Sequence, residues 1–224
     1  MYWQIQYLIV IKGIAYRKDN REVAMFLFSK LKDYKVPGDV DEALLWKSFC
    51  NEEKEALSKL FRIYYGSLLD YGKRLVSDEE AAKDGIQKLF LKLWRKRNSI
   101  GVPDSVKAYL IVSYRRILLR RKEQKLNRYR RNQEYLDGIF NVSFSKEELI
   151  VQDEIVAQKK DELVKGINQL SGRQKETLFL KYYHGLTNKE IAEVLEINHQ
   201  SVKNNLYRAF KNLKGIVKSV PSLE

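Results

Sequence analysis

The sequence predicts an all-α protein: two small helical domains joined by a flexible linker, the second ending in a helix-turn-helix. Apolar residues recur at three- and four-residue spacing along most of the 224-residue chain, which is the period of amphipathic helices. Segments with the alternating pattern of strands are scarce. Only three prolines occur, and each stands at a break between the periodic segments, at Pro37, Pro103 and Pro221.

The composition points to a polyanionic partner. Forty-two basic residues against twenty-nine acidic ones leave a net charge of +13 and a pI near 9.6, which favours nucleic acid over a membrane. The single cysteine, Cys50, excludes a disulfide within the chain and a cysteine zinc cluster. One cysteine also fits a reducing compartment, so we expect a cytoplasmic protein.

Residues 1–40 form an N-terminal extension of uncertain status. Its apolar run, residues 7–11, is far shorter than the roughly twenty residues of a membrane span, and no basic residue precedes Lys12 as a signal peptide requires. We therefore expect a protein that is not embedded in a membrane. Met25 leaves a second start of translation open.

The first predicted domain covers residues 41–131. Two segments from Asp41 onward carry an apolar face, and the sequence SDEE from Ser77 predicts the start of a further helix that runs to Trp94. Gly101 and Pro103 place residues 98–105 in a loop. The apolar face of the first two segments consists of Leu44, Leu45, Phe49, Leu57, Leu60, Phe61, Tyr64, Leu68 and Leu69.

A long helix follows, capped by Asp104 or Ser105 and running from Val106 to about Arg131. Between Tyr114 and its end it carries nine basic residues and one acidic residue. A charge run is usually a solvated face. The tyrosines within it and the loop at its entrance make contact with DNA backbone and unstacked bases at least an equal alternative.

An acidic, irregular segment, residues 132–160, is the predicted linker. A second helical domain then covers residues 161–218, with Gly185 ending one of its helices, and a tail covers 219–224. Within this domain Thr187 and Glu190 fit a capping box, which fixes the start of a short helix. Residues 196–198 leave a three-residue break, and Asn198 can cap the helix that follows.

The last helix has two contrasting sides. Val202, Leu206, Ala209 and Leu213 form its apolar stripe. The opposite side and the leading end are polar and basic, which suits base edges and phosphates in a major groove. These predicted DNA-contacting residues are His199, Gln200, Lys203, Asn204 and Arg208.

Nothing in the sequence favours an enzyme. It has no glycine-rich phosphate loop, and its two histidines and one cysteine make no convincing metal set, so we expect no catalytic residue, no cofactor, no metal and no small-molecule substrate. The carboxylates of residues 78–80 cluster at a helix start, where they stabilise the helix dipole.

Over about residues 42–216 the chain resembles bacterial RNA polymerase sigma factors of the extracytoplasmic-function group. The first domain carries the resemblance to the promoter-melting domain of that family at Ala82, Asp84, Gln87, Phe90, Trp94, Tyr109, Leu110 and Arg115. The second resembles the upstream-element domain at Leu170, Arg173, Gln174, Leu180, Gly185, Leu186, Glu190, Ile191, Ala192, Leu195, Ile197, Ser201, Val202, Lys203, Arg208, Ala209 and Leu213.

The resemblance implies two partners, core RNA polymerase and promoter DNA, and leaves an anti-sigma factor open as a third. The last helix would read the promoter element at about −35 in the major groove. Polymerase docking would fall to Asp84, Gln87, Lys88 and Leu91. Capture of unpaired bases at about −10 would fall to Asn98, Ser99, Lys107, Tyr109, Arg115, Arg116, Arg120 and Arg121.

Three positions depart from the family pattern. Arg116 stands where an asparagine is usual, Arg120 replaces an aspartate, and Glu196 replaces the glycine of the turn between the last two helices. The arginines strengthen the expected backbone contact, whereas Glu196 leaves the turn geometry less certain.

A free-standing transcriptional regulator is the alternative. Residues 170–213 also resemble the DNA-binding domain of two-component and quorum-sensing regulators, which would dimerise and bind a paired site unaided. The first domain argues against it, because nothing there reads as an α/β receiver.

Overall fold

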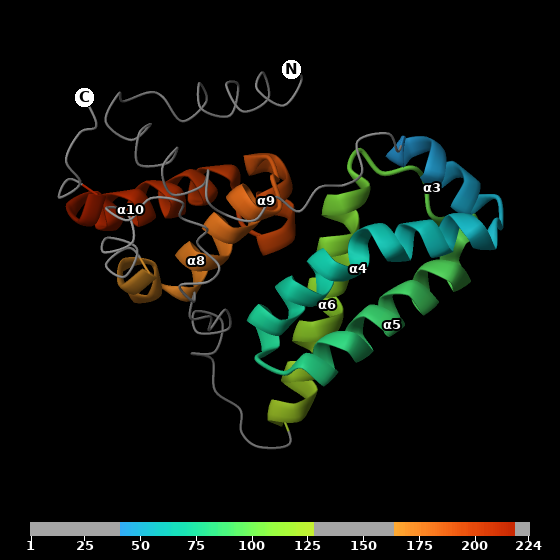
Figure 1. Cartoon of the computed structure of the whole chain (residues 1–224), viewed down its shortest axis with the longest axis horizontal. Helices are drawn as coiled ribbons and strands as arrows, with labels where there is room; N and C mark the ends of the chain where they lie inside the picture. Colours follow the sequence, from blue (N-terminus) through green and yellow to red (C-terminus); the bar gives the residue numbers. More distant parts are fainter. Residues whose placement is uncertain (1–40, 128–163, 218–224) are drawn as a thin grey trace, which may run out of the picture.

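The computed structural model describes residues 41–127 and 164–217, which are helical with short connections and contain no strand (Figure 1). The predicted extension, linker and tail lie outside the described residues. The N-terminal bundle consists of α3 (Glu42–Cys50), α4 (Lys54–Val76), α5 (Glu79–Lys96), the short η1 (Arg97–Ser99) and α6 (Val106–Asn127). The C-terminal helices are residues 164–169, α8 (Gly172–Leu178), its π-helical continuation η3 (Phe179–Tyr183), α9 (Asn188–Leu195) and α10 (His199–Val217). This confirms the predicted fold class.

Local capping places most helix starts where the sequence predicts them. The Oγ of Ser105 accepts a hydrogen bond from the amide of Ala108 and caps α6. The start of α5 is one residue later than predicted. Ser77 is in the left-handed region, with φ of 52°, where it ends α4, so Asp78 is the residue that caps α5 through the amide of Ala81.

The core of the N-terminal bundle is rich in aromatic rings. Trp46, Phe49, Tyr64, Tyr71 and Tyr114 are among its fully buried side chains. The expectation that Leu44 belongs to this core is wrong, since its side chain is 62% exposed. On the nine-residue α3 the inward positions are Leu45, Trp46 and Phe49, and 100° per residue turns Leu44 out of that arc.

Helices α4, α5 and α6 approach closely at two glycines. A Cβ at Gly72 would overlap the hydroxyl of Tyr114, and one at Gly85 would lie 2.6 Å from a methyl group of Leu118. The side chain of Tyr114 lies against both glycines. Its hydroxyl donates a hydrogen bond of 2.8 Å to the carbonyl of Ala82. Glycine therefore sets how near α6 lies to its neighbours.

The C-terminal helices are capped as the sequence predicts. Thr187 and Glu190 form a complete capping box at α9, and Asn198 caps α10 by accepting a 2.7 Å hydrogen bond from the amide of Ser201. Gly185, with φ of 69°, follows η3. Glu196 adopts φ of 54° and ψ of 43°, so the turn keeps the left-handed geometry of its usual glycine.

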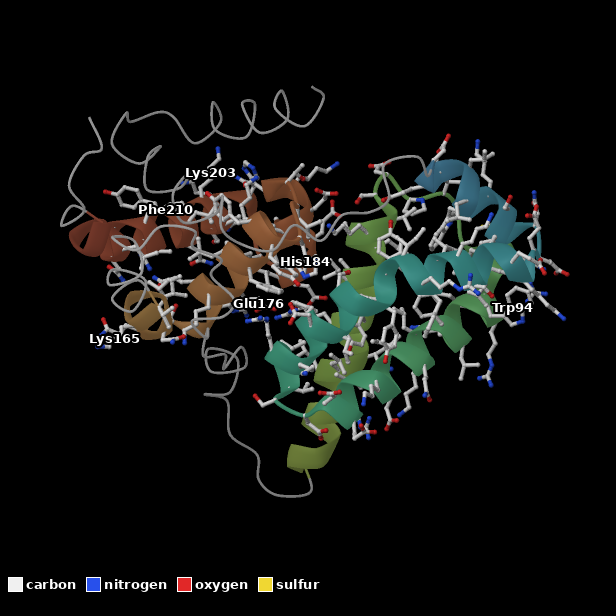
Figure 2. All side chains as sticks on the ribbon, in the orientation of Figure 1. Trp94, Lys165, Glu176, His184, Lys203 and Phe210 are labelled. Carbon is white, nitrogen blue, oxygen red and sulfur yellow. The ribbon has the colours of Figure 1, made fainter. Side chains whose placement is uncertain are left out.

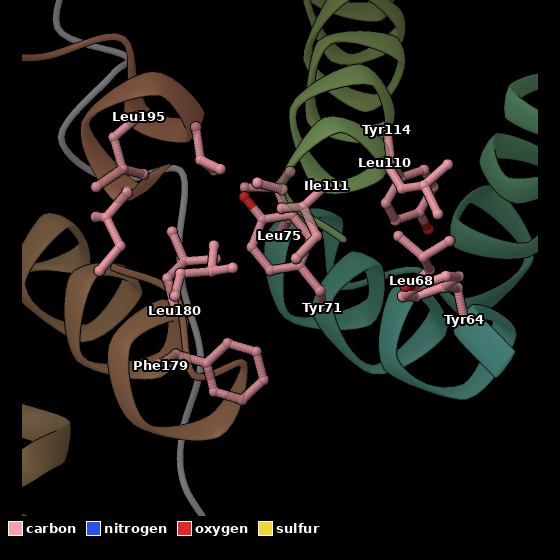
Figure 3. Close-up of a cluster of buried hydrophobic side chains, with 14 of the residues drawn as sticks. Tyr64, Leu68, Tyr71, Leu75, Leu110, Ile111, Tyr114, Phe179, Leu180 and Leu195 are labelled. Carbon is pink, nitrogen blue, oxygen red and sulfur yellow. The ribbon is translucent and has the colours of Figure 1, made fainter. Parts of the chain in front are cut away.

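The two parts of the molecule share one core. Figure 3 shows Tyr71, Leu75 and Ile111 of the N-terminal bundle facing Phe179, Leu180 and Leu195 of the C-terminal helices. All belong to one contiguous cluster of buried side chains. Helix α6 lies between the rest of the bundle and α9 (Figure 1). Within the described ranges, no helix is both long enough and apolar enough to cross a bilayer.

Candidate functional site

One side of α10 presents the predicted DNA-contacting residues together. His199, Gln200, Lys203, Asn204 and Arg208 are all exposed, and we call this set the recognition face. The apolar stripe opposite, Val202, Leu206, Ala209 and Leu213, is buried as expected. Figure 2 shows Lys203 standing outward on the side of α10 that faces away from α8.

The recognition face lies on a helix that can enter a major groove. Its leading end is held by the Asn198 cap, and Gln200 donates a 3.1 Å hydrogen bond to Asn204 along the exposed side. Cationic side chains can contact phosphates while the amides contact base edges. The geometry suits duplex DNA.

Helix α5 presents the predicted polymerase-docking residues as a stripe. Asp84, Gln87, Lys88 and Leu91 follow the i, i+3, i+4, i+7 spacing of one helix face, and we call them the docking stripe. Gln87 and Lys88 are exposed, and Leu91 is 58% exposed. Asp84 pairs with Arg121 of α6 at 3.0 Å.

The loop before α6 is anchored by the bundle. The indole of Trp46 donates a 3.1 Å hydrogen bond to the carbonyl of Gly101, and its ring lies edge-on to Tyr109 with centroids 5.4 Å apart. Asn98 donates to the carboxylate of Glu52 at 3.2 Å, and Ser99 is exposed beside it. This end of the predicted downstream set is accessible.

At the other end of that set three residues contact the C-terminal helices, although the side chain of Arg116 stays 65% exposed. Arg115 is 5% exposed, Arg116 pairs with Glu196 at 2.9 Å, and the ammonium of Lys107 donates to the carbonyl of His184. Arg120 is exposed, while Arg121 pairs with Asp84 of the docking stripe. The eight residues of the predicted downstream set therefore do not form one open surface.

A buried polar cluster joins the two parts of the molecule. Glu176 of α8, 2% exposed, accepts a 2.7 Å hydrogen bond from the Tyr71 hydroxyl and a 3.0 Å ionic hydrogen bond from Arg115, both at Oε1. We call these three residues the interface triad. Figure 2 places Glu176 where the C-terminal helices meet the N-terminal bundle. A charge pair this deeply buried is held by the mutual satisfaction of its partners.

The surroundings of the interface triad shift its ionisation. Burial, and then the Glu176 carboxylate, hold the pKa of Tyr71 well above its ordinary value of 10, so the hydroxyl stays a donor. Burial alone would lower the pKa of Arg115, but the attraction of Glu176 outweighs it and raises that pKa. Both donors to Glu176 therefore keep their protons.

His184 is a second buried group at the same interface. Its ring lies edge-on to Phe179 and Tyr71, with centroids 5.0 and 5.9 Å away. Neither ring nitrogen has a hydrogen-bond partner among the described residues. Burial first, and then the nearby charges of Lys107 and Arg74, lower the pKa of His184 well below 6.5, so the ring is neutral.

The starts of α6 and α9 also meet. Burial would raise the pKa of Glu190, but hydrogen bonds from Thr187 and from Ser105, the cap of α6, outweigh it and lower that pKa. Burial lowers the pKa of Lys107, which lies beside this carboxylate. The capping box of α9 therefore also contacts the N-terminal bundle.

Sequence reasoning missed Tyr71, Glu176 and His184. A signal for Glu176 was present, because it stands three and four residues before the core positions Phe179 and Leu180 and so lies on the apolar side of its helix. Tyr71 likewise continues the apolar stripe of Leu68 and Leu75. A carboxylate on an apolar face indicates a buried partner, but the sequence does not say which one.

Comparison with known proteins agrees with this architecture. The family described as "Sigma-70, region 4" matches residues 160–213. RNA polymerase sigma factor YlaC of Bacillus subtilis (strain 168) is 24% identical over 170 residues, which is 73% of this chain and 92% of that protein. ECF RNA polymerase sigma factor SigK of Mycobacterium ulcerans (strain Agy99) is 21% identical over 180 residues, covering 80% and 95%.

A solved structure shares the fold. It is that of CnrH in complex with the cytosolic domain of CnrY, with a TM-score of 0.51 and 15% identity, covering 80% of this chain and 97% of that chain. The relatives extend over both helical parts, and the family match covers the helix-turn-helix that carries the recognition face. The C-terminal part therefore carries the sigma-70 region 4 domain, and over most of its length the chain is similar to RNA polymerase sigma factors of the extracytoplasmic-function group.

Proposed function

We propose that this sigma factor divides promoter recognition between its two helical parts, with the recognition face of α10 reading an element at about −35 in the major groove. The family assignment establishes the general activity: the protein binds core RNA polymerase and promoter DNA to initiate transcription and catalyses no covalent step. The observation that carries the division is the recognition face, where five side chains stand exposed on a helix capped at its leading end.

The docking stripe is the proposed binding site for core polymerase. Its spacing places Gln87, Lys88 and Leu91 on one accessible side of α5. Helix α5 lies apart from α10, which carries the recognition face (Figure 1). A protein interface combines an apolar centre with a polar rim, and Leu91 with its polar neighbours supplies both kinds of group. Polymerase and duplex DNA would then be bound by different helices.

The proposed site for unpaired bases at about −10 is the loop of residues 98–105 together with α6. Asn98 and Ser99 are accessible, and Tyr109 is held against Trp46 beside them. The arginines of α6 would hold the backbone of the captured strand. Because bacterial RNA polymerase is cytoplasmic, we place the protein in the cytoplasm; an anti-sigma factor stays an expectation of the family resemblance.

Run-off transcription tests the proposal. Fragments of the source genome are transcribed with core RNA polymerase alone and with this protein added. New start sites that share two spaced elements are expected, and they supply the promoter. If no new start appears and the protein alone gives specific footprints on paired sites, it is a free-standing regulator and the proposal fails.

Two binding assays, one with core polymerase and one with an upstream-element duplex, separate docking from DNA reading. Asp84→Ala and Gln87→Ala are expected to weaken binding to core polymerase, because each removes a polar contact from the docking stripe, and to leave upstream-element binding unchanged. Glu55→Ala, an exposed carboxylate on α4, is the matched control. Equal loss of both activities in the two docking variants would contradict the division of roles.

A further inference from the structure

We propose that Glu52 is a positioning residue for strand capture: it turns the side-chain amide of Asn98 so that the loop accepts hydrogen bonds from a captured base, which selects adenine or cytosine over guanine or thymine. Glu52 lies in the turn between α3 and α4, outside the recognition face, the docking stripe and the downstream set. The inference rests on the proposed function, since it concerns the base that residues 98–105 would take from the melted strand.

One carboxylate oxygen of Glu52 holds two residues at the start of the loop. Its Oε1 accepts a 2.7 Å hydrogen bond from Nη2 of Arg97 and a 3.2 Å hydrogen bond from Nδ2 of Asn98. The hydrogen bond from Asn98, and then the hydrogen bond and charge of Arg97, lower the pKa of Glu52. The carboxylate is therefore ionised at neutral pH and acts only as an acceptor.

The arginine that holds Glu52 is itself fixed by α5. Nη1 of Arg97 donates a 2.7 Å hydrogen bond to the carbonyl of Trp94, and the guanidinium lies over the Trp94 ring, 4.4 Å from its centroid. Glu52 also has a left-handed backbone, with φ of 70°, which is uncommon for a residue with a side chain. Such conformations persist where the surrounding contacts impose them, and they concentrate at functional sites. The carboxylate therefore has a defined place beside Asn98.

Helix α3 fixes the next part of the loop. The Cys50 thiol donates to the carbonyl of Ile100 at 3.5 Å, and the Trp46 indole donates to the carbonyl of Gly101 at 3.1 Å. Both carbonyls are thereby bound to the N-terminal bundle. The conformation of the loop entrance is therefore set before DNA binds.

Asn98 and Ser99 are exposed at this entrance, and each directs a donor to the protein. The Asn98 amide has an NH₂ group and a carbonyl oxygen, and only the NH₂ group can face an ionised carboxylate. Its Oδ1 therefore faces away from Glu52. The Ser99 hydroxyl donates its single proton to the carbonyl of Lys96 at 2.9 Å, which leaves its oxygen as an acceptor. Each side chain thus offers an acceptor oxygen to a base.

Acceptor oxygens on the protein discriminate between two classes of base. Adenine and cytosine carry an exocyclic amino group, N6 or N4, where guanine and thymine carry a keto oxygen, O6 or O4. An unpaired base exposes this edge to the protein. The amino group can donate to Asn98, whereas a keto oxygen in its place loses water without gaining a hydrogen bond. The loop should therefore prefer amino bases to keto bases.

Binding to a melted promoter measures this preference. The probe is a promoter fragment found by run-off transcription, with its downstream element held unpaired, and each unpaired position carries each of the four bases in turn. Binding is measured with the holoenzyme, which consists of core polymerase and the full chain. At one position the wild type should bind amino bases about tenfold more tightly than keto bases, within the range of a specific base contact. If no position shows this preference, the proposal fails.

Glu52→Gln tests the role of the carboxylate at almost constant size. The glutamine amide can donate to Oδ1 of Asn98, so the Asn98 amide can turn and offer its NH₂ group to the base. The preference for amino bases should fall at least about fivefold, which corresponds to one hydrogen bond. Equal weakening with all four bases would show that Glu52 only supports the loop, and an unchanged preference would show that it does not orient Asn98. Either result overturns the proposal.

Two further variants keep this test decisive. Asn98→Ala removes the oriented amide itself and should abolish the same preference, even if Glu52→Gln alters the loop. Glu53→Gln makes the same chemical change at the next residue, which is exposed and makes no side-chain cap hydrogen bond to α4. It should keep the wild-type preference. Loss of the preference in the Glu53 variant would show that charge near the loop discriminates the bases, and would overturn the role of Glu52.

Failure of this inference and failure of the proposed function are distinguishable. In NMR spectra of the protein without DNA, the side-chain NH₂ resonances of Asn98 should move in Glu52→Gln and stay in place in Glu53→Gln. If no new start site appears, the function fails, whereas these resonances still decide whether Glu52 holds Asn98. If start sites appear and the holoenzyme binds amino and keto bases alike at every unpaired position, the selectivity alone is wrong.

Discussion

Helices α6 and α10 carry similar signals in the sequence and have opposite surroundings in the structure. Both have basic residues along one side, and both are expected to contact promoter DNA. On α10 Lys203 and Arg208 stand in solvent, whereas on α6 Arg115 is buried against Glu176 and Arg116 is paired with Glu196. The charge along a helix indicates what kind of ligand it can bind. Whether its charged side chains are accessible depends on the helices packed against it.

The largest expected effect comes from breaking the buried charge pair on one side only. Glu176→Ala leaves Arg115 buried without its carboxylate, which should cost the packing of the two parts about 3–5 kcal/mol. Replacing both, in Arg115→Met with Glu176→Met, should recover most of that loss, because no uncompensated charge remains. Fluorescence energy transfer during urea titration measures both, with dyes at the exposed positions Ser58→Cys on α4 and Asn212→Cys on α10 in a Cys50→Ala background. Equal losses would show that shape, not charge, holds the contact.

A second variant should disturb α6 and spare α10. At Gly72 an alanine Cβ would overlap the Tyr114 hydroxyl and lie 2.8 Å from its Cζ, so α6 must shift. Overpacking of this kind costs about 1–3 kcal/mol, more than the helix propensity that alanine adds. Thermal unfolding should show the loss, with upstream-duplex binding retained below the transition. Gly101→Ala is the control, since a Cβ there meets nothing within 4 Å; a similar loss in it would refute the steric explanation.

The converse variants should disturb α10 and spare α6. Lys203→Ala and Arg208→Ala should each weaken upstream-duplex binding by about 1–3 kcal/mol, the range for a direct contact in the major groove. Energy transfer should stay at the wild-type value. Lys165→Ala is the matched control, because Lys165 is exposed on another side of the C-terminal helices (Figure 2). Equal weakening in the control would mean that net charge alone binds the duplex.

The smallest expected effect is a pH dependence of stability, which should depend on the buried His184 and not on the exposed His199. Burial, Lys107 and Arg74 lower the pKa of His184, and Tyr71 and Tyr183 also line its ring. A depressed histidine pKa favours the folded protein above 6.5, and this contribution is lost as pH falls toward the lowered pKa. Stability should therefore decline by at most about 1.4 kcal/mol per pH unit below 6.5.

Unfolding free energies between pH 7.5 and pH 5 test this expectation at moderate ionic strength. His184→Leu should flatten the decline, since the leucine cannot take up a proton. His199→Asn, at the exposed start of α10, should keep the wild-type slope. A decline that is steep in all three proteins would assign the pH dependence to carboxylates elsewhere.

Local chemistry made the second helical part predictable. Thr187 with Glu190, Asn198, and the stripe from Val202 to Leu213 each depend on residues within one or two turns of each other. Their spacing determines the helix starts and the buried side of α10. The recognition face then follows as the side that remains, and the structure leaves it exposed.

The contact between the two parts could not be predicted in the same way. Tyr71 and Glu176 are separated by 105 positions, and Arg115 and Glu176 by 61, so no local period connects them. The start of α5 shows the same limit at short range. Ser77 and Asp78 are both residue types that cap helices well. Asp78 caps α5 because Ser77 adopts the left-handed conformation that ends α4.

Glu196 couples two properties of the protein that would otherwise vary independently. Its left-handed backbone, at φ of 54°, costs a non-glycine residue about 1–2 kcal/mol, and its carboxylate holds Arg116 at 2.9 Å. A glycine there would relax the turn and release the arginine in one step. The helix-turn-helix would become more stable to heat, while Arg116, whose side chain is already 65% exposed, would lose only a surface ion pair worth about 0–1 kcal/mol.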